Sequence, residues 1–130
     1  MTKILAISLL GLALLAPARL ADAKEPVEGK FFHHVYFWLN APDSDGQRAE
    51  FLTKLRKMQA IPTIRYSAIG TPAGTPRDVV DNSWTFYWLV TFDDADGWRI
   101  YNDHPLHDQF RQEAGPLFKK VQVYDVILED

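Results

Sequence analysis

The sequence predicts a ferredoxin-like α+β protein with the element order β-α-β-β-α-β and an antiparallel four-stranded sheet. Two observations predict this class. Stretches rich in aromatic and β-branched residues alternate with stretches of helical periodicity, and prolines and glycines separate them. At least three of the four predicted strands are apolar on both faces. Because the helices of this fold cover only one face of the sheet, we expect a second copy to cover the other, giving a homodimeric α+β barrel.

Residues 1–23 are typical of a secretory signal peptide. A positively charged start precedes the apolar run 4–16, and Ala21 and Ala23 stand at the −3 and −1 positions of a cleavage site. Ala18 ends a second possible site. The run is shorter than the roughly 20 residues of a membrane span. We therefore expect a secreted or periplasmic protein that has no membrane contact after cleavage, with a buried N-terminal helix as the alternative.

The rest of the chain is predicted to be one domain at residues 31–130, after a flexible leader at residues 24–30. The whole chain has 14 basic and 17 acidic residues, and its basic residues do not cluster. Nucleic acid is therefore not an expected partner. The chain contains no cysteine, which excludes disulfides and thiolate metal ligands.

The first predicted strand covers residues 31–39. A helix follows it, because Ser44 and Gln47 are spaced as a capping box, in which each side chain bonds the backbone N–H of the other residue. This helix is expected to end near Ala60, since Pro62 disfavours helical geometry in the residue before it.

The second half supplies three more strands. Residues 63–69 and 83–92 are predicted strands, joined by a long loop at residues 70–82 that holds two prolines and two glycines. A helical region follows, capped by one of the aspartates after residue 92. The last predicted strand covers residues 121–128.

Two of the four histidines lie within the helical region, at residues 101–110. His104 precedes Pro105, so we expect one helix to break at His104 and the next to begin at Pro105. His104 then caps the second helix, His107 lies one turn into it, and Tyr101 reaches back from the first helix. We expect the three polar tips to converge on one pocket.

Five short motifs occur in order along residues 32–127: His34-Val35, Ile61-Pro62, Val90-Thr91-Phe92, Tyr101…His104-Pro105-Leu106-His107…Phe110 and Val121-Gln122-Val123-Tyr124-Asp125. Together they resemble the stress-responsive A/B barrel (Dabb) family, which implies a dimeric α+β barrel and an association with stress. Some plant members of this family are cofactor-free polyketide cyclases that use a Tyr–His pair, and that pair matches Tyr101 and His107. The family's pocket lies between sheet and helices, and His34 matches a histidine that lines it. The third-strand histidine of the cyclases corresponds to Phe86 here.

These residues suggest acid/base chemistry without a cofactor. His107 is the candidate base, because an imidazole accepts a proton near neutral pH. Tyr101 is the candidate donor to the oxyanion that forms. The expected ligand is a small aromatic or carbonyl-bearing molecule. The other candidate ligand-binding residues are His34, Tyr36, Trp38, Trp88 and His104.

The same residues allow two alternative interpretations. In the first, the protein is a non-catalytic, stress-associated homodimer, its pocket is filled by its own large side chains, and Tyr101 and His107 are structural. In the second, His34, His104 and His107 bind a metal or haem, although the spacing demands no such group and we expect none. His33 lies on the opposite strand face from His34, so we place it at the dimer interface.

Overall fold

The computed structural model describes residues 26–129. The predicted signal peptide and the first two residues of the leader lie outside this part of the chain. The end of the leader is tied to the sheet, because the backbone N–H of Lys30 donates to the carbonyl of Phe92 over 3.0 Å. Leu128 in turn donates to the carbonyl of Lys30 over 2.9 Å.

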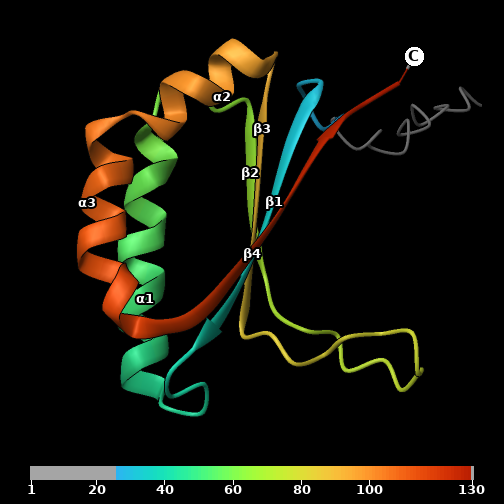
Figure 1. Cartoon of the computed structure of the whole chain (residues 1–130), viewed down its shortest axis with the longest axis vertical. Coiled ribbons are helices and arrows are strands. Elements are labelled where there is room, and N and C mark those ends of the chain that lie inside the picture. Colours follow the sequence, from blue (N-terminus) through green and yellow to red (C-terminus); the bar gives the residue numbers. More distant parts are fainter. Residues whose placement is uncertain (1–25, 130) are drawn as a thin grey trace, which may run out of the picture.

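Four antiparallel strands form one sheet in the order β2-β3-β1-β4. The strands are β1 (Phe31–Leu39), β2 (Tyr66–Gly70), β3 (Phe86–Phe92) and β4 (Phe118–Ile127). The helices are α1 (Asp45–Lys57), α2 (Ala95–Asn102) and α3 (Pro105–Ala114), and short 3-10 turns, η1 (Met58–Ala60) and η2 (Gly115–Leu117), extend α1 and α3. All the helices lie on one side of the sheet (Figure 1). The predicted ferredoxin-like fold is confirmed. None of the helices in residues 26–129 is long and apolar enough to cross a membrane.

The start of α1 confirms half of the predicted capping box. Ser44 Oγ accepts from the backbone N–H of Gln47 over 3.3 Å. The Gln47 side chain, however, accepts from the N–H of Ala41 over 2.7 Å, not from that of Ser44. The preceding turn explains the difference, because the N–H of Ser44 already donates to the carbonyl of Ala41.

Three strands begin elsewhere than predicted. β2 begins at Tyr66, three residues late, because the chain first makes a turn in which Ile64 donates to the carbonyl of Ile61. β3 also begins three residues late, at Phe86. β4 begins at Phe118, three residues early, directly after η2. The last difference matters for the site, because β4 then pairs with β1 along the whole of β1.

The core lies between the sheet and the helices. Burial alternates strictly along β1, so every second side chain points into this layer. Phe51 of α1 is fully buried and stacks on Phe86, with ring centroids 5.6 Å apart. The helix-facing side chains of β1 are Phe31, His33, Val35, Phe37 and Leu39.

None of the helices in the described part of the chain lies over the other face of the sheet (Figure 1). It carries aromatic side chains, and Tyr36 has its ring centroid 5.0 Å from that of Tyr87 and 6.2 Å from that of Tyr124. The loop at residues 71–85, which joins β2 to β3, projects on this same side, away from the helices (Figure 1). It therefore does not cover the layer between the sheet and its own helices.

Candidate functional site

A cavity of about 370 Å³ lies between the sheet and the helices. Its volume is within the range of small-molecule sites. Most of its wall is apolar, and its polar side chains come from β1, β4, α2 and α3. The lining residues are His33, Val35, Phe37, Met58, Trp88, Trp98, Tyr101, Asn102, His107, Phe110, Arg111, Phe118, Val121, Val123 and Asp125.

His33 and Asp125 face each other across the two strands. They are paired in the β1–β4 register, and Nδ1 of His33 lies 2.5 Å from Oδ1 of Asp125. The carboxylate accepts the Nδ1–H and so selects the tautomer that leaves Nε2 with its lone pair. Burial lowers the pKa of His33, although Asp125 opposes this by favouring the charged ring. The ring is therefore mainly neutral at neutral pH.

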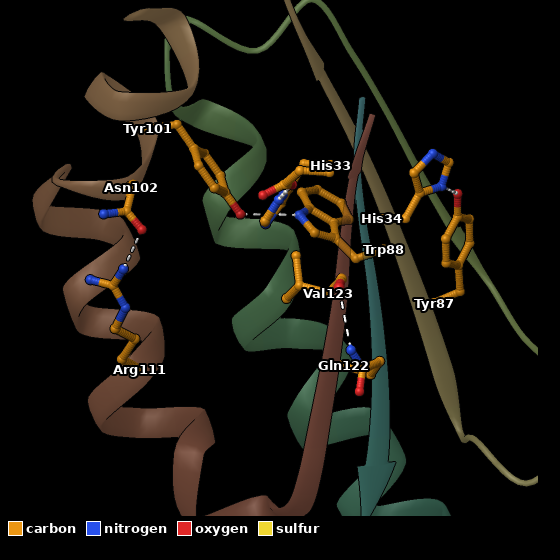
Figure 2. A network of polar contacts seen from close by, with 10 residues as sticks. His33, His34, Tyr87, Trp88, Tyr101, Asn102, Arg111, Gln122 and Val123 are labelled. Atoms are coloured by element: carbon orange, nitrogen blue, oxygen red, sulfur yellow. Dashed lines mark hydrogen bonds and ion pairs between the residues drawn. The ribbon is translucent and has the colours of Figure 1, made fainter. Parts of the chain in front are cut away.

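Tyr101 of α2 is buried, and its ring centroid is 5.8 Å from that of His33. Its hydroxyl oxygen accepts from Nε1 of Trp88 over 3.3 Å (Figure 2). Burial raises the pKa of Tyr101 to about 12, so the hydroxyl keeps its proton at any physiological pH. Since the tryptophan can only donate, the proton of Tyr101 remains for another acceptor.

His107 of α3 packs against the ring of Tyr101, with centroids 4.7 Å apart and planes at 71°. The predicted meeting of Tyr101 and His107 is therefore present. Nδ1 of His107 is buried and has no hydrogen-bond partner in the described residues. Burial, helped by the nearby charge of Arg111, lowers the pKa of His107 to about 4. His107 is thus neutral at neutral pH and a weak proton acceptor.

Arg111 ties α3 to α2 at the rim of the cavity. Its guanidinium donates to the side-chain oxygen of Asn102 over 2.7 Å (Figure 2). It also donates to the carboxylate of Asp108 over 2.7 Å. Both Arg111 and Asn102 line the cavity. The bonds hold the charge of the guanidinium near His107, which is why Arg111 contributes to the low pKa of that histidine.

Three predicted pocket residues lie elsewhere. We expected His34, Tyr36 and Trp38 in the pocket, but they are on the outer face of the sheet. Figure 2 shows His34, with its hydrogen bond to Tyr87, on the side of the strands away from Tyr101. We placed His33 at the dimer interface, but it lies on the helix-facing side of β1 and lines the cavity. Strand alternation separates the two faces but does not say which one the helices cover.

The other two predicted ligand-binding residues, Trp88 and His104, differ in whether they line the cavity. Trp88 lines the cavity, as predicted. His104 does not, because its Nδ1 accepts from the N–H of Leu106 and caps α3, the structural role also predicted for it. Since His34 is on the outer face and His104 is at the cap, neither joins His107 in a three-imidazole set. No cluster of three metal-ligating side chains occurs in residues 26–129.

Sequence reasoning missed several lining residues, chiefly His33 and Asp125. One signal was available for His33. It shares its strand face with Phe31, Val35, Phe37 and Leu39, which are all apolar, whereas the face of His34 carries Tyr36 and Trp38 with their polar tips. The more apolar face is the better candidate for the core. For Asp125 no local signal existed, because its partner is 92 residues away.

The fold and the cavity define a ferredoxin-like α+β domain with a pocket of the size that binds small molecules. The chain belongs to the stress responsive A/B barrel domain (Dabb) family, whose model matches residues 31–128. A comparison with curated proteins found no match.

Solved structures support the same fold. A dimeric ferredoxin-like protein of unknown function from Thermobifida fusca is 25% identical, with a TM-score of 0.63, over 79% of this chain and 95% of that one. A Dabb family protein from Mesorhizobium loti is 23% identical, with a TM-score of 0.67, over 79% and 100%. A hydroxynitrile lyase from Passiflora edulis is 20% identical, with a TM-score of 0.67, over 81% and 97%. At such identities the last two show the fold alone.

Proposed function

We propose that this protein binds a small carbonyl-bearing molecule in the cavity and removes a proton next to the carbonyl, without a cofactor. One observation carries the proposal. The carboxylate-bonded His33 and the protonated hydroxyl of Tyr101 come from different elements and lie side by side in the wall of one largely apolar cavity. A base and a hydrogen-bond donor at one site are what enolisation of a carbonyl compound needs.

Each group has a defined part in this reaction. Nε2 of His33 takes the proton from the carbon next to the carbonyl, and the electrons of that C–H bond move to the carbonyl oxygen. The Asp125 carboxylate stabilises the imidazolium that forms, in the way that a carboxylate holds the histidine of a Ser-His-Asp triad. Tyr101 donates its proton in a hydrogen bond to the developing enolate oxygen. Return of the proton from His33 to carbon completes an exchange or isomerisation. Alternatively, the enolate carbon attacks a second carbonyl group, whose C=O electrons move to its oxygen, and that oxygen takes the proton from His33.

His107, which we predicted as the base, has a different part in this proposal. Its low pKa makes it a poor proton acceptor, whereas Asp125 raises the pKa of His33 relative to burial alone. His107 packs on the ring of Tyr101, so we assign it the positioning of that ring. The fold is compatible with catalysis, since the Passiflora edulis protein of the same fold is a hydroxynitrile lyase.

Exchange of hydrogen for deuterium next to a carbonyl tests the proposal directly. Propiophenone in D2O, followed by proton NMR, should lose its α-proton signal faster with the protein than with buffer alone. His33→Gln should slow this exchange by about 100-fold or more, the usual size of a general-base contribution. Tyr101→Phe should slow it by a similar factor, as the loss of one oxyanion donor does.

The matched control is His34→Gln, which changes the neighbouring histidine on the other face of the sheet and should leave the exchange unchanged. A His33→Gln variant as fast as the native protein contradicts the assigned base. Ketones that bind but do not exchange indicate the alternative, a protein that binds without turnover. The cavity favours a ligand in either case, since its own side chains leave about 370 Å³ unfilled.

We also propose that the protein is an exported homodimer. The aromatic outer face of the sheet and the dimeric state of the Thermobifida fusca relative support the dimer. The layout of residues 1–23 supports export. Native mass spectrometry of the protein from the periplasm or medium tests both. The expected species is a dimer of chains that begin at Lys24, or at Arg19 if cleavage follows Ala18.

A further inference from the structure

We propose that the substrate is a keto acid, whose carboxylate binds to Arg111 at the rim of the cavity while its carbonyl group lies between His33 and Tyr101. The inference deepens the proposed function and rests on it for the carbonyl site. The carboxylate site is a separate claim, and it follows from the charged side chains of the cavity wall and from the hydrogen bonds of Arg111.

Two charged side chains line the cavity within the part of the chain that the structure describes, one on the strand side and one on the helix side. Asp125 belongs to β4, and its carboxylate accepts the Nδ1–H of His33. Arg111 belongs to α3. Figure 2 shows Arg111 beside Asn102 on the helices, with His33 and Trp88 on the strands. An anionic ligand is therefore repelled at the strand side and attracted at the helix side, which orients its carboxylate toward α3.

The guanidinium of Arg111 has hydrogen-bond donors left for a ligand. It carries five N–H groups. Within residues 26–129 it uses one N–H of Nη1 for Asp108 and one of Nη2 for Asn102, so three remain. A carboxylate can accept two N–H groups of one guanidinium side by side, and such charge-assisted bonds are stronger than neutral ones. The bonds to Asn102 and Asp108 already hold the guanidinium in place, so little ordering is left for the ligand to impose.

Asp108, the present ionic partner of Arg111, is a weak competitor for this ligand. Asp108 lies three residues before Arg111 on α3, its side chain is 57% exposed, and it does not line the cavity. Exposed ion pairs of this kind contribute little, because water solvates both charges. A ligand carboxylate reaches the same guanidinium from the cavity, where most of the wall is apolar and the attraction is screened less.

The charge of Arg111 acts on the polar end of the cavity, where the side chains of His33, Tyr101 and His107 meet. Burial raises the pKa of Tyr101 and lowers that of His107, and in both cases the charge of Arg111 works toward the lower pKa. Arg111 and His107 are four residues apart, so they project from the same face of α3, about 5 Å apart along its axis. This spacing favours a keto acid whose carboxylate and carbonyl group are separated by a short carbon chain.

A carboxylate added to the propiophenone probe tests this site. 4-Oxo-4-phenylbutanoate is propiophenone with a carboxylate on its terminal carbon, and its methyl ester is nearly the same molecule without the charge. Calorimetric titration of the protein should give an affinity for the acid at least about tenfold above that for the ester, as expected for charge-assisted hydrogen bonds. High salt should reduce this difference, because it screens the ion pair.

Arg111→Gln removes the charge and should lower the affinity for the acid to that for the ester. Arg99→Gln is the matched control, because Arg99 makes the same kind of ion pair with Asp96, over 2.6 Å, but does not line the cavity. It should leave both affinities unchanged. Asp108→Asn removes the competing carboxylate and should raise the affinity for the acid alone, by about two- to fivefold. Since misfolding does not tighten binding, this variant tests the site even if Arg111→Gln folds poorly.

4-Phenylbutanoate, which lacks the carbonyl group, separates the two claims. Acid and ester that bind equally well, with an exchange that depends on His33, overturn the carboxylate site and leave the proposed function. 4-Phenylbutanoate that binds through Arg111, while no ketone exchanges, overturns the proposed function and leaves the carboxylate site. An equal loss of acid affinity in Arg99→Gln and Arg111→Gln indicates attraction by overall charge and overturns the carboxylate site. Failure of all three compounds to bind overturns both.

Discussion

His33 and His107 lie in one cavity but in opposite electrostatic surroundings. His33 has a carboxylate partner at 2.5 Å, which compensates part of the cost of burying a charged ring. His107 has the guanidinium of Arg111 nearby and a buried nitrogen that has no hydrogen-bond partner within residues 26–129. An imidazolium is therefore much better tolerated at His33 than at His107. This difference favours His33 over His107 as the residue that takes up and releases a proton.

The low pKa of His107 predicts a pH-dependent stability. In the unfolded chain the ring takes up a proton near its ordinary pKa of 6.5, but in the folded protein it does so only near pH 4. Between these values the unfolded state binds more protons, so the free energy of unfolding falls as the pH is lowered from about 6.5 to 4. At about 1.4 kcal/mol per pKa unit, full charging of the ring would cost about 3 kcal/mol, and solvent screening of the partly exposed ring reduces this to on the order of 2 kcal/mol.

Urea denaturation at pH 7 and pH 4 measures this effect. His107→Phe should reduce the loss of unfolding free energy between the two pH values by about 2 kcal/mol. The comparison uses the difference between pH values, so a change in stability that is independent of pH does not affect it. Part of the loss should persist in the variant, because the pKa of His33 is also lowered. An unchanged loss in the variant would refute the assignment.

At the scale of elements, the bend between α2 and α3 (the elbow, residues 103–104) positions the polar end of the cavity. α2 ends at Asn102, and α3 begins at Pro105 with His104 as its N-cap. The proline prevents one continuous helix, so Tyr101 and His107 lie on different helices and meet ring to ring. The elbow is thus a structural requirement of the site, although His104 itself does not line the cavity.

The cap can be separated from the site by mutation. His104→Ala removes the acceptor for the N–H of Leu106 and should lower the free energy of unfolding by about 1 kcal/mol. His104→Asn keeps a capping acceptor and should preserve most of that stability. Both variants should bind ketones with native affinity, measured by calorimetry beside urea denaturation. A stable alanine variant with lost ketone affinity would instead show that His104 touches the ligand.

At the scale of the whole molecule, the sheet has one covered and one uncovered face. The helices cover the face that holds the site, and the loop at residues 71–85 projects from the other side (Figure 1). The uncovered face is rich in aromatic rings, and β4 at the edge of the sheet exposes apolar side chains along most of its length. Exposed edges and apolar faces of this kind favour association.

A charge on this face should separate the proposed dimer. Val126 of β4 is 41% exposed in a single chain, so Val126→Glu should fold but give a monomer by light scattering. Ile100→Glu is the matched control, because Ile100 is an exposed apolar residue on α2, in the helical layer. It should leave the dimer intact. A native protein that stays monomeric at high concentration would contradict the dimer itself.

Much of this molecule was predictable from local sequence, because local physics decides it. The order of the elements follows from periodicity and from the prolines and glycines. The break at His104 follows from the steric effect of Pro105 on the residue before it. The proximity of Tyr101 and His107 follows from their spacing across that break, and the apolar character of both strand faces predicts a buried outer face.

Only the tertiary structure decided which histidine of the pair His33 and His34 faces the helices. Alternation along a strand has a period of two, so it divides the side chains into two sets without assigning either set to the core. The docking of the helices makes that assignment. The pairing of His33 with Asp125 likewise depends on the register between β1 and β4, which joins residues 92 positions apart. Sequence alone therefore predicted a site that uses a histidine, whereas long-range packing determined which histidine lies in the cavity.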